Sequence, residues 1–454
     1  MSRAQADIGA ASDALSIFAA ARDAGDATAL RIGEQSLSFA QLARHVAVRL
    51  AELDLRGTTL YPLIGSNTLE TLVTLYALLE TRTAALLLHP RHTESERGAV
   101  LDAARDAGGS SDPDVAAVIY TSGTSGAPRG VVLTRSALRS SAEASAANLG
   151  WEDNDCWLLA MPLARVGGLS IVTRCLAARR AVALAPAFDA RLLPDWIAQQ
   201  RVTLISLVPT MLAKCLAEHP GWTPPSHLRA ILLGGAAASP RLLAQAAQRG
   251  LPIVITYGCT ETCSQVVTTP YLRRYAAASC GAGQALEGVQ LRVAGGRIEV
   301  RGAMLMSGYL GEPALERDAW FDTGDLGEID DQGWLHVHAR RTDLIVSGGE
   351  NIYPAEVERV LEICAGVVAA GVFGVADEIW GQTIAAALVV AADAPPDQAI
   401  IDHMVAHLAA YKRPRQVCVV PALPHTGAGK LDRQALRDMT AALRPLRSAG
   451  STVD

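Results

Sequence analysis

Hydrophobic and polar positions near the start of the chain follow two alternating patterns. Residues 39–53 and 68–83 place apolar side chains at the three- and four-residue spacing of a helix. Residues 60–65 and 84–90 are short apolar runs that are typical of buried strands. Helices that alternate with buried strands in this way cover a parallel sheet, so the pattern predicts an α/β architecture.

The same alternation continues as far as about residue 265. Strands predicted over 116–120 and 130–134 flank a loop rich in Gly, Ser and Thr, and a helical pattern follows from Ser136. Further strand-like runs, each separated from the next by a helical pattern, extend the layered sheet: WLLAMPL, AVALAP, VTLISLVP, RAILLGG and PIVITYG.

The pattern changes at Gly281. Short alternating runs with Gly-containing turns, VQLRVAGGRIEVRG and GWLHVHAR, predict a smaller and partly antiparallel subdomain. After Arg340 the remaining residues predict strands and two helices, PAEVERVLEIC and IDHMVAHLAAY, which is an α+β pattern. We therefore predict a large N-terminal domain over 1–339 and a small C-terminal domain over 340–454.

Composition supports a globular protein of more than one domain. A chain of 454 residues is longer than one hydrophobic core supports, and 50% of its residues are hydrophobic while 19% are charged. The formal net charge is −6, and neither sign forms a long block that would bind nucleic acid or an anionic membrane. We find no signal peptide and no apolar stretch of about 20 residues, so we expect a soluble, cytoplasmic protein.

Eight cysteines are scattered along the sequence. Only Cys259 and Cys263 lie close together, and no second pair follows at the spacing of zinc ligands. We therefore expect buried free thiols.

The loop between the strands at 116–120 and 130–134 carries the first candidate chemistry. It reads YTSGTSGAPRG and combines hydroxyls, glycines and one cation: Thr121, Ser122, Gly123, Thr124, Ser125, Gly126 and Arg129. Glycine lets backbone N–H groups approach phosphate oxygens, hydroxyls donate to them, and a guanidinium offsets their charge. A mobile surface loop is the alternative, whereas a Walker loop fits poorly, because the motif's Lys is missing and the chain returns as a strand instead of opening a helix.

These residues resemble the phosphate-binding signature of the adenylate-forming superfamily, which includes acyl-CoA synthetases, adenylation domains of nonribosomal peptide synthetases, and luciferases. Later motifs match in the order of that family: Gly234-Gly235-Ala236, Tyr257-Gly258-Cys259-Thr260-Glu261, Phe321-Asp322-Thr323-Gly324-Asp325, RRTDLIVSGGEN from Arg340 to Asn351, and Pro424 to Lys430. The resemblance covers roughly residues 30–440. Its fold is a large layered N-terminal domain followed by a small mobile C-terminal domain.

The resemblance implies a reaction in two halves. A carboxylate attacks the α-phosphorus of ATP with loss of pyrophosphate, and a thiol then attacks the acyl-adenylate. Glu261 would hold Mg²⁺, Thr260 and the loop would hold phosphates, and Lys430 would stabilise the charge that develops during adenylation. The nucleoside would be bound by Gly235, Ala236, Tyr257, Gly258, Asp325 and Arg340, with Asp325 accepting from both ribose hydroxyls.

In the second half the resemblance implies that the small domain rotates. Lys430 would leave the site, and the thiol tunnel would form from Ser347, Gly348, Gly349 and Glu350. The chain departs from the family at three positions. Arg129 replaces the usual Lys, which changes the contact geometry with phosphates. Thr342 stands at the hinge in place of Asp or Lys, and Ala339 replaces a glycine.

The acyl pocket implied by the resemblance includes Arg165, Gly167, Gly168 and Gly234. Arg165 replaces a gating His and either binds a carboxylate, phosphate or pantetheine group or faces solvent at the pocket mouth. The compact length and the runs SLVPT and LLGGAA are most similar to the 2-succinylbenzoate:CoA ligases. We therefore expect an aromatic or compact acid.

The predicted activity is that of an AMP-forming acid–thiol ligase with ATP, Mg²⁺ and coenzyme A. One alternative is loading of the acid onto the phosphopantetheine of a free-standing acyl carrier protein, which presents the same thiol. The other is a non-ligase acyltransferase or nucleotide-binding homologue that has lost adenylation.

Overall fold

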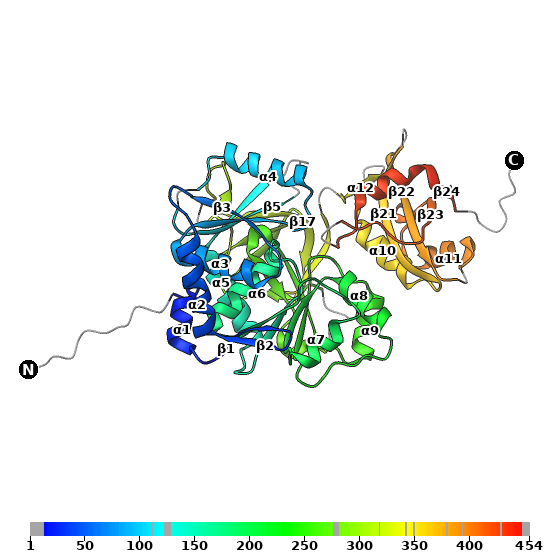
Figure 1. Cartoon of the computed structure of the whole chain (residues 1–454). Helices are drawn as coiled ribbons and strands as arrows, with labels where there is room; N and C mark the ends of the chain where they lie inside the picture. The colour runs from blue at the N-terminus through cyan, green and yellow to red at the C-terminus, as the bar shows by residue number, and fades with distance from the viewer. Residues whose placement is uncertain are drawn as a thin grey trace, which may run out of the picture.

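The computed structural model describes residues 13–110, 112–121, 129–275, 281–316, 318–340, 343–347, 350–377, 380–392, 394–426 and 429–446. A large α/β part built from the first three quarters of the chain lies beside a smaller α+β part (Figure 1). This arrangement confirms the predicted fold class.

One sheet of the large part has the strand order β16-β6-β5-β4-β3. Strands β3, β4 and β5 run parallel, whereas β6 returns antiparallel to β5 and β16 pairs antiparallel with β6. The bounds are β3 (Leu60–Ile64), β4 (Ala84–Leu88), β5 (Val115–Thr121), β6 (Arg129–Thr134) and β16 (Gly308–Tyr309).

A second sheet has nine strands in the order β13-β12-β11-β10-β9-β7-β8-β1-β2, with a parallel centre and antiparallel edges. The bounds are β1 (Thr28–Ile32), β2 (Gln35–Ser38), β7 (Cys156–Leu159), β8 (Ala181–Leu184), β9 (Leu204–Leu207), β10 (Ala230–Leu233), β11 (Ile253–Cys259), β12 (Ser264–Thr268) and β13 (Gln284–Ala285).

Nine α-helices cover these sheets in the described part of the chain. They are α1 (Ile17–Ala24), α2 (Phe39–Glu52), α3 (Leu69–Thr81), α4 (Glu94–Asp106), α5 (Arg135–Leu149), α6 (Val166–Ala178), α7 (Leu193–Gln199), α8 (Pro209–Glu218) and α9 (Pro240–Gln248). Helices α3 and α6 are buried along most of their length and share one core cluster with strands of both sheets. Their nearly uniform apolar sequence is explained by this position.

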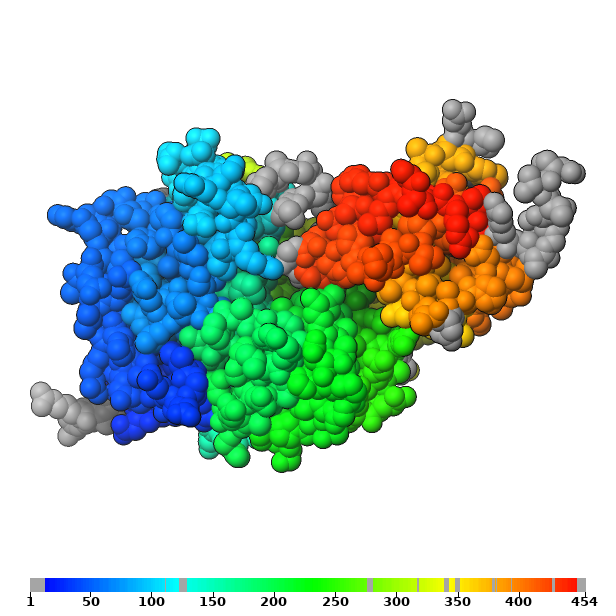
Figure 2. All heavy atoms as spheres, turned by 45° about the vertical axis from the view of Figure 1, so that its right-hand side comes forward, coloured from blue at the N-terminus to red at the C-terminus, as the bar shows by residue number. Residues whose placement is uncertain are grey.

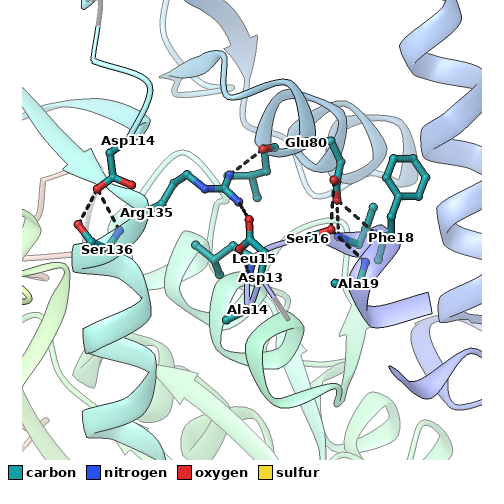
Figure 3. Close-up of polar contacts among 12 residues, drawn as sticks. Asp13, Ala14, Leu15, Ser16, Phe18, Ala19, Glu80, Asp114, Arg135 and Ser136 are labelled. Carbon is teal, nitrogen blue, oxygen red and sulfur yellow. Dashed lines mark hydrogen bonds and ion pairs between the residues drawn. The ribbon is translucent and has the colours of Figure 1, made fainter. Parts of the chain in front are cut away.

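The beginning of the described chain is held against the large part by three charged side chains, of which Arg135 is buried (Figure 3). Arg135, at the start of α5, donates to Asp13 Oδ2 at 2.7 Å and to the carbonyl oxygen of Leu79 at 2.6 Å. Glu80 accepts from the backbone N–H of Ile17 at 2.6 Å and from the Ser16 hydroxyl at 3.1 Å. The carboxylate of Glu80 therefore holds the N-terminus of α1, where negative charge is favourable.

A third sheet and the smaller part complete the fold. The third sheet contains β14 (Gln290–Ala294), β15 (Arg297–Arg301), β17 (Phe321–Ile329) and β18 (Leu335–Arg340). The smaller part contains the hairpin β19 (Ile345–Ser347) and β20 (Glu350–Ile352), the sheet β21 (Val367–Asp377), β22 (Gly381–Val390), β23 (Gln416–Val419) and β24 (Arg444–Pro445), and the helices α10 (Pro354–Ile363), α11 (Asp397–His407) and α12 (Arg433–Arg437). Short 3-10 helices are η1 (Thr260–Thr262), η2 (Tyr271–Arg273), η5 (Ala410–Lys412) and η6 (Asp438–Ala442).

Residues of the smaller part form two hydrophobic clusters of their own, which a separate domain requires. The boundary between residues 339 and 340 stays a prediction, because β18 ends at Arg340 and the next two residues lie outside the described ones. One helix prediction was wrong at its ends. The helix expected over 401–411 begins at Asp397, directly after Pro396, and ends at His407.

The two parts touch along helices α8 and α9. Arg241 in α9 donates through Nη1 to the carbonyl oxygen of Val367 at 3.4 Å, and Thr210 in α8 donates to the carbonyl oxygen of Gly429 at 3.4 Å. Figure 2 shows the orange and red atoms of the C-terminal part against the green atoms of this region. Within the described residues, no helix has the length and apolar content needed to cross a membrane.

The prediction of free thiols is confirmed for the cysteines that the structure describes. Cys156, Cys175, Cys215, Cys263, Cys364 and Cys418 are buried free thiols, and Cys259 is a partly exposed one. Cys280 lies outside the described residues.

Candidate active site

The predicted phosphate loop begins and ends at one point of the five-stranded sheet. Thr121 ends β5, Arg129 begins β6, and the two residues are register partners across the antiparallel pair. The two ends of the loop therefore lie at one place on the sheet, with Arg129 at its base. Five of its predicted phosphate ligands lie outside the described residues: Ser122, Gly123, Thr124, Ser125 and Gly126.

Arg129 is held by two contacts. Its Nε and Nη2 donate to the two carboxylate oxygens of Glu312 at 3.1 and 2.6 Å, which is a bidentate ion pair. Its guanidinium carbon also lies 3.3 Å from the centre of the Tyr309 ring. The hydrogen bonds to Glu312 raise the pKa of Arg129 further, so this side chain is always a cation.

Tyr309 connects this cation to the predicted metal ligand. Its hydroxyl donates to Glu261 Oε1 at 3.3 Å, and the guanidinium of Arg129 lies over the face of its ring. Burial and the negative charge of Glu261 raise the pKa of Tyr309, so the phenol keeps its proton and remains a donor. The sequence pattern gave no sign of this residue, because a tyrosine in a two-residue strand is an ordinary packing residue.

The short helix η1 fixes Glu261 through its backbone. The carbonyl oxygen of Glu261 accepts from the N–H of Met306 at 2.8 Å, which joins η1 to the segment before β16. Thr262 is fully buried, and its hydroxyl accepts from the N–H of Cys259 at 2.9 Å and donates to the carbonyl oxygen of Ser264 at 2.8 Å. Thr260 and Glu261 are therefore placed in one short turn, as the motif predicts.

A buried carboxylate lies on β17. Asp325 is 8% exposed and accepts from the Tyr257 hydroxyl at 2.8 Å, and the same hydroxyl lies 3.0 Å from Thr323 Oγ1. Burial and the charge of Asp325 hold the pKa of Tyr257 well above its usual range, so this phenol is neutral. Arg340 is the register partner of Asp325 on β18, which brings the two predicted ribose ligands to neighbouring strands.

Two motif glycines have a packing reason to be glycine. A Cβ at Gly234 would overlap Thr256, and a Cβ at Gly258 would overlap the carbonyl group of Ser264. Gly235 adopts φ 80°, which favours glycine, in the turn that leads to Ala236. The backbone at Gly234, which follows β10, therefore lies directly against Thr256, the residue before Tyr257.

Asn67 fixes the loop that carries the acyl-pocket residues. Its side-chain amide donates to the carbonyl oxygens of Met161 at 3.0 Å and Ala185 at 3.1 Å, and its Oδ1 accepts from the N–H of Leu163 at 3.1 Å. Asn67 is buried, so these bonds replace the water that the loop backbone would otherwise bind. Sequence reasoning missed this residue, which has no motif around it.

Gly167 and Gly168 form the first turn of α6, directly after that loop and Arg165. A Cβ at Gly168 would overlap the carbonyl oxygen of Pro162, and one at Gly167 would lie 2.7 Å from Met161 Cε. The loop is therefore packed closely against the helix N-terminus.

Lys430 lies in a tight turn of the C-terminal part. The N–H of Thr426 donates to the carbonyl oxygen of Lys430 at 2.7 Å, and Gly429, at φ 77°, packs against Thr210 at the start of α8. The exposed side chain of Lys430 therefore starts beside the large part. Ser347 and Glu350 are paired in the β19–β20 hairpin, whereas Gly348, Gly349 and Thr342 lie outside the described residues.

Comparison with known proteins identifies the family. The AMP-binding enzyme family matches residues 105–310, and the AMP-binding enzyme C-terminal domain matches residues 356–430. A 2-succinylbenzoate–CoA ligase of Bacillus mycoides is 42% identical over 337 residues, which cover 71% of this chain and 69% of the relative. The chain belongs to the AMP-binding enzyme family.

Solved structures show the same likeness over 96% of this chain. The o-succinylbenzoate CoA synthetase of Bacillus subtilis in complex with its acyl-adenylate OSB-AMP is 31% identical, with a TM-score of 0.84 over 96% of this chain and 99% of that one. A double mutant of the same enzyme bound to the product analogue OSB-NCoA is 32% identical over 96% and 100% of the two chains, with a TM-score of 0.67.

These relatives confirm the predicted class of enzyme. The chain is an AMP-forming acid–thiol ligase that uses ATP, Mg²⁺ and coenzyme A. Its described residues fit a magnesium nucleotide, because Tyr309 contacts both the carboxylate of Glu261 and the loop cation Arg129 and so brings these two charges close together. The non-ligase alternative is thereby set aside.

Proposed function

We propose that the acid activated by this ligase is 2-succinylbenzoate, and that coenzyme A is the thiol that receives it. The observation that carries the proposal is the likeness to 2-succinylbenzoate–CoA ligases, which covers up to 91% of the chain in sequence and 96% in structure. No described contact favours a carrier protein as the acceptor. The free thiols suit a reducing compartment such as the cytoplasm, where we place the reaction.

The roles proposed for the site residues follow from charge. An acid anion must approach the polyanion ATP, so cations and a metal must neutralise the phosphates. Arg129 stands at the base of the phosphate loop, and Glu261 offers the carboxylate for Mg²⁺, which lowers the repulsion when it is bound. Thr121 and Thr260 lie beside these two residues as hydroxyl donors.

Asp325 is proposed to accept the ribose hydroxyls. Its carboxylate is buried and already accepts from Tyr257, which holds the carboxylate in place and leaves capacity for further donors. Adenine would lie along the narrow turn of Gly235 and Ala236, beside Gly258.

We also propose that the C-terminal part, residues 340–454, changes its position between the two half-reactions. The higher TM-score against the adenylate complex than against the product-analogue complex, at equal coverage, supports an arrangement suited to adenylation. The contact between Gly429 and Thr210 keeps Lys430 beside the large part in this arrangement. Rotation would exchange Lys430 for the hairpin that carries Ser347.

Carboxylate-dependent ATP–pyrophosphate exchange tests this proposal. We expect exchange with 2-succinylbenzoate, and we expect Lys430→Ala to lower it by about 10²–10³-fold because a charge-stabilising donor is lost. Lys214→Ala is the matched control, since Lys214 is an exposed lysine on α8, the helix that the Lys430 turn contacts, and its loss should leave exchange unchanged.

Exchange with another acid but not with 2-succinylbenzoate would overturn the proposed substrate. Equal losses in the two lysine variants would remove the specific role of Lys430. Product formation with coenzyme A, but not with a phosphopantetheinyl carrier protein, completes the test of the acceptor.

A further inference from the structure

A group of basic side chains lies in the segments that follow strands β4 and β7, and none of them is among the residues proposed to bind the nucleotide. We call it the basic corner, and it consists of His89, Arg91, His92 and Arg165. The N–H of Ala164 donates to the carbonyl oxygen of Gly65, and the N–H of Gly65 donates to that of Leu88. These two bonds place the residues that follow Ala164 and Leu88, which are Arg165 and His89, at the same edge of the fold.

His89 carries a buried donor with no partner. The side chain is 6% exposed, and its Nδ1 accepts from the backbone N–H of Arg91 at 3.2 Å. In the neutral ring the proton is therefore on Nε2. Nε2 is buried and has no hydrogen-bond partner among the described residues. An unpaired buried N–H costs free energy, which a ligand that accepts the bond would recover.

Arg165 also has a buried donor without a described partner, and its side chain is a cation. Its Nε is buried and has no hydrogen-bond partner within the described part of the chain. Burial and the nearby positive charge of Arg91 lower its pKa. A guanidinium that is partly removed from water and lies near another cation is suited to bind an anion.

The carboxylate of Glu96, which raises the pKa of His89, is already engaged. Glu96 accepts from the N–H of Thr93 at 2.7 Å and from its hydroxyl at 2.9 Å, in the capping box of α4. Arg165 is also the N-cap residue of α6, whose first turn has no side-chain cap and no acidic residue. The N-terminal end of this helix adds further positive potential beside the guanidinium.

Position favours the acid as the source of the anion. Arg165 directly precedes the first turn of α6, where the predicted acyl-pocket residues Gly167 and Gly168 lie. Asn67 holds the loop before it, so the arginine stands on a fixed support. A dicarboxylic acid such as 2-succinylbenzoate has one carboxylate on the succinyl arm and one on the ring, and only one of them is activated.

We propose that Arg165 and His89 bind the carboxylate of the substrate that is not activated, and thereby select dicarboxylic acids. This inference rests on the proposed function for its substrate, and it names the residues that would recognise it. The second carboxylate would accept from the guanidinium of Arg165 and from Nε2–H of His89. Both donors would then be paired, whereas a monocarboxylic acid would leave them buried and unsatisfied.

Exchange kinetics with three acids provide the test. They are 2-succinylbenzoate, 4-oxo-4-phenylbutanoate, which lacks the ring carboxylate, and 2-butanoylbenzoate, which lacks the carboxylate of the arm. We expect Arg165→Gln to raise the KM for 2-succinylbenzoate by about 10–100-fold, because hydrogen bonds to a charged group are lost. The KM for whichever monocarboxylic acid is activated should stay within about twofold of its wild-type value, since the bond is already absent there.

Two further variants guard against a general defect. His89→Asn keeps an acceptor near the N–H of Arg91 but removes Nε2–H, and it should show the same selective change at a smaller size. Arg56→Gln removes an arginine that pairs with Asp54 on the surface, and it should change nothing. Equal KM increases for dicarboxylic and monocarboxylic acids, or an increase in the KM for coenzyme A alone, would overturn the proposal.

A binding measurement separates this proposal from the proposed function. Phthalate titrated onto the protein should shift the imidazole NMR signal of His89 in the wild type but not in Arg165→Gln. A shift without any exchange of 2-succinylbenzoate would keep the dicarboxylate site and overturn the substrate. Exchange without a shift and without selective KM changes would keep the substrate and overturn the site.

Discussion

Two charged regions of the large part differ in how their charges are paired. At the nucleotide edge, which we define as Glu312, Arg129, Tyr309 and Glu261, each side chain contacts the next. In the basic corner, buried nitrogens of His89 and Arg165 have no partner in the described structure. Phosphates that bind Arg129 must therefore compete with Glu312, whereas an anion that binds Nε2 of His89 and Nε of Arg165 displaces no described hydrogen bond of these two atoms.

This difference has a physical consequence for affinity and selectivity. When a ligand replaces an existing hydrogen-bond partner, the net gain in binding free energy is small, because one hydrogen bond is broken for each one that forms. Satisfying a buried unpaired donor yields more, and a substrate that fails to do so is penalised. The nucleotide edge is thus suited to orient a ligand whose affinity comes from many contacts, and the basic corner is suited to discriminate between acids.

The largest effect should come from breaking the nucleotide edge at its carboxylate. We expect Glu261→Gln to lower exchange by about 10²–10³-fold, because the proposed magnesium ligand loses its charge. Tyr309→Phe, which keeps the ring under Arg129 but removes the hydroxyl, should cost only about 3–10-fold, because its 3.3 Å bond to Glu261 is long and should contribute no more than an ordinary hydrogen bond of about 0.5–1.5 kcal/mol.

Magnesium titration of ATP binding distinguishes positioning from packing in these two variants. If Tyr309 orients Glu261, the Mg²⁺ concentration for half-maximal ATP binding rises in Tyr309→Phe while thermal stability stays near the wild-type value. A lower melting temperature with an unchanged magnesium requirement would mean that the tyrosine only packs.

A smaller effect should follow from removing the partner of the loop cation. Glu312→Gln frees Arg129 from its ion pair, and exposed pairs of this kind are worth about 0.2–1 kcal/mol. Phosphates would no longer compete with Glu312, so the KM for ATP should fall by up to about fivefold. The converse variant, Arg129→Gln, removes the cation itself and should raise the KM for ATP. A higher KM in Glu312→Gln would show instead that the pair presents Arg129 to the phosphates.

The smallest effect concerns the pH dependence of stability in the basic corner. Burial, and then the positive charges of Arg165, Arg91 and His92, lower the pKa of His89 to about 4, although Glu96 acts in the opposite direction. Because the folded pKa lies below the unfolded one, the stability from neutral His89 is present above about pH 6.5 and is lost as pH falls through about 4.

Urea unfolding of the wild type and His89→Asn across this pH range measures that contribution. We expect the wild type to lose about 1–3 kcal/mol relative to the variant between about pH 6.5 and 4. Parallel pH profiles for the two proteins would show that His89 is not buried in a positive environment.

The sequence alone was sufficient for the layers, the class of reaction and the order of the motifs. The alternation of helical patterns, such as residues 68–83, with short apolar strands predicts an α/β fold, because burial of one face sets the spacing of the hydrophobic positions. The hydroxyl- and glycine-rich loop, Glu261 and Lys430 belong to motifs whose residues are close in the chain, so their chemistry is readable before folding. The likeness to 2-succinylbenzoate ligases was also visible at this level.

Only the tertiary structure decided which distant residues meet. Glu312 lies far from Arg129 in the chain, Tyr309 joins that arginine to Glu261, and Asn67 fixes a loop about a hundred residues away. No local pattern marks such partners, because hydrogen bonding and ion pairing depend on distance in space. For the same reason Arg165 was left between a ligand role and a solvent-facing one in the sequence. Its Nε is buried without a partner in the described structure, as is Nε2 of His89, and this favours the ligand role that the sequence position alone left open.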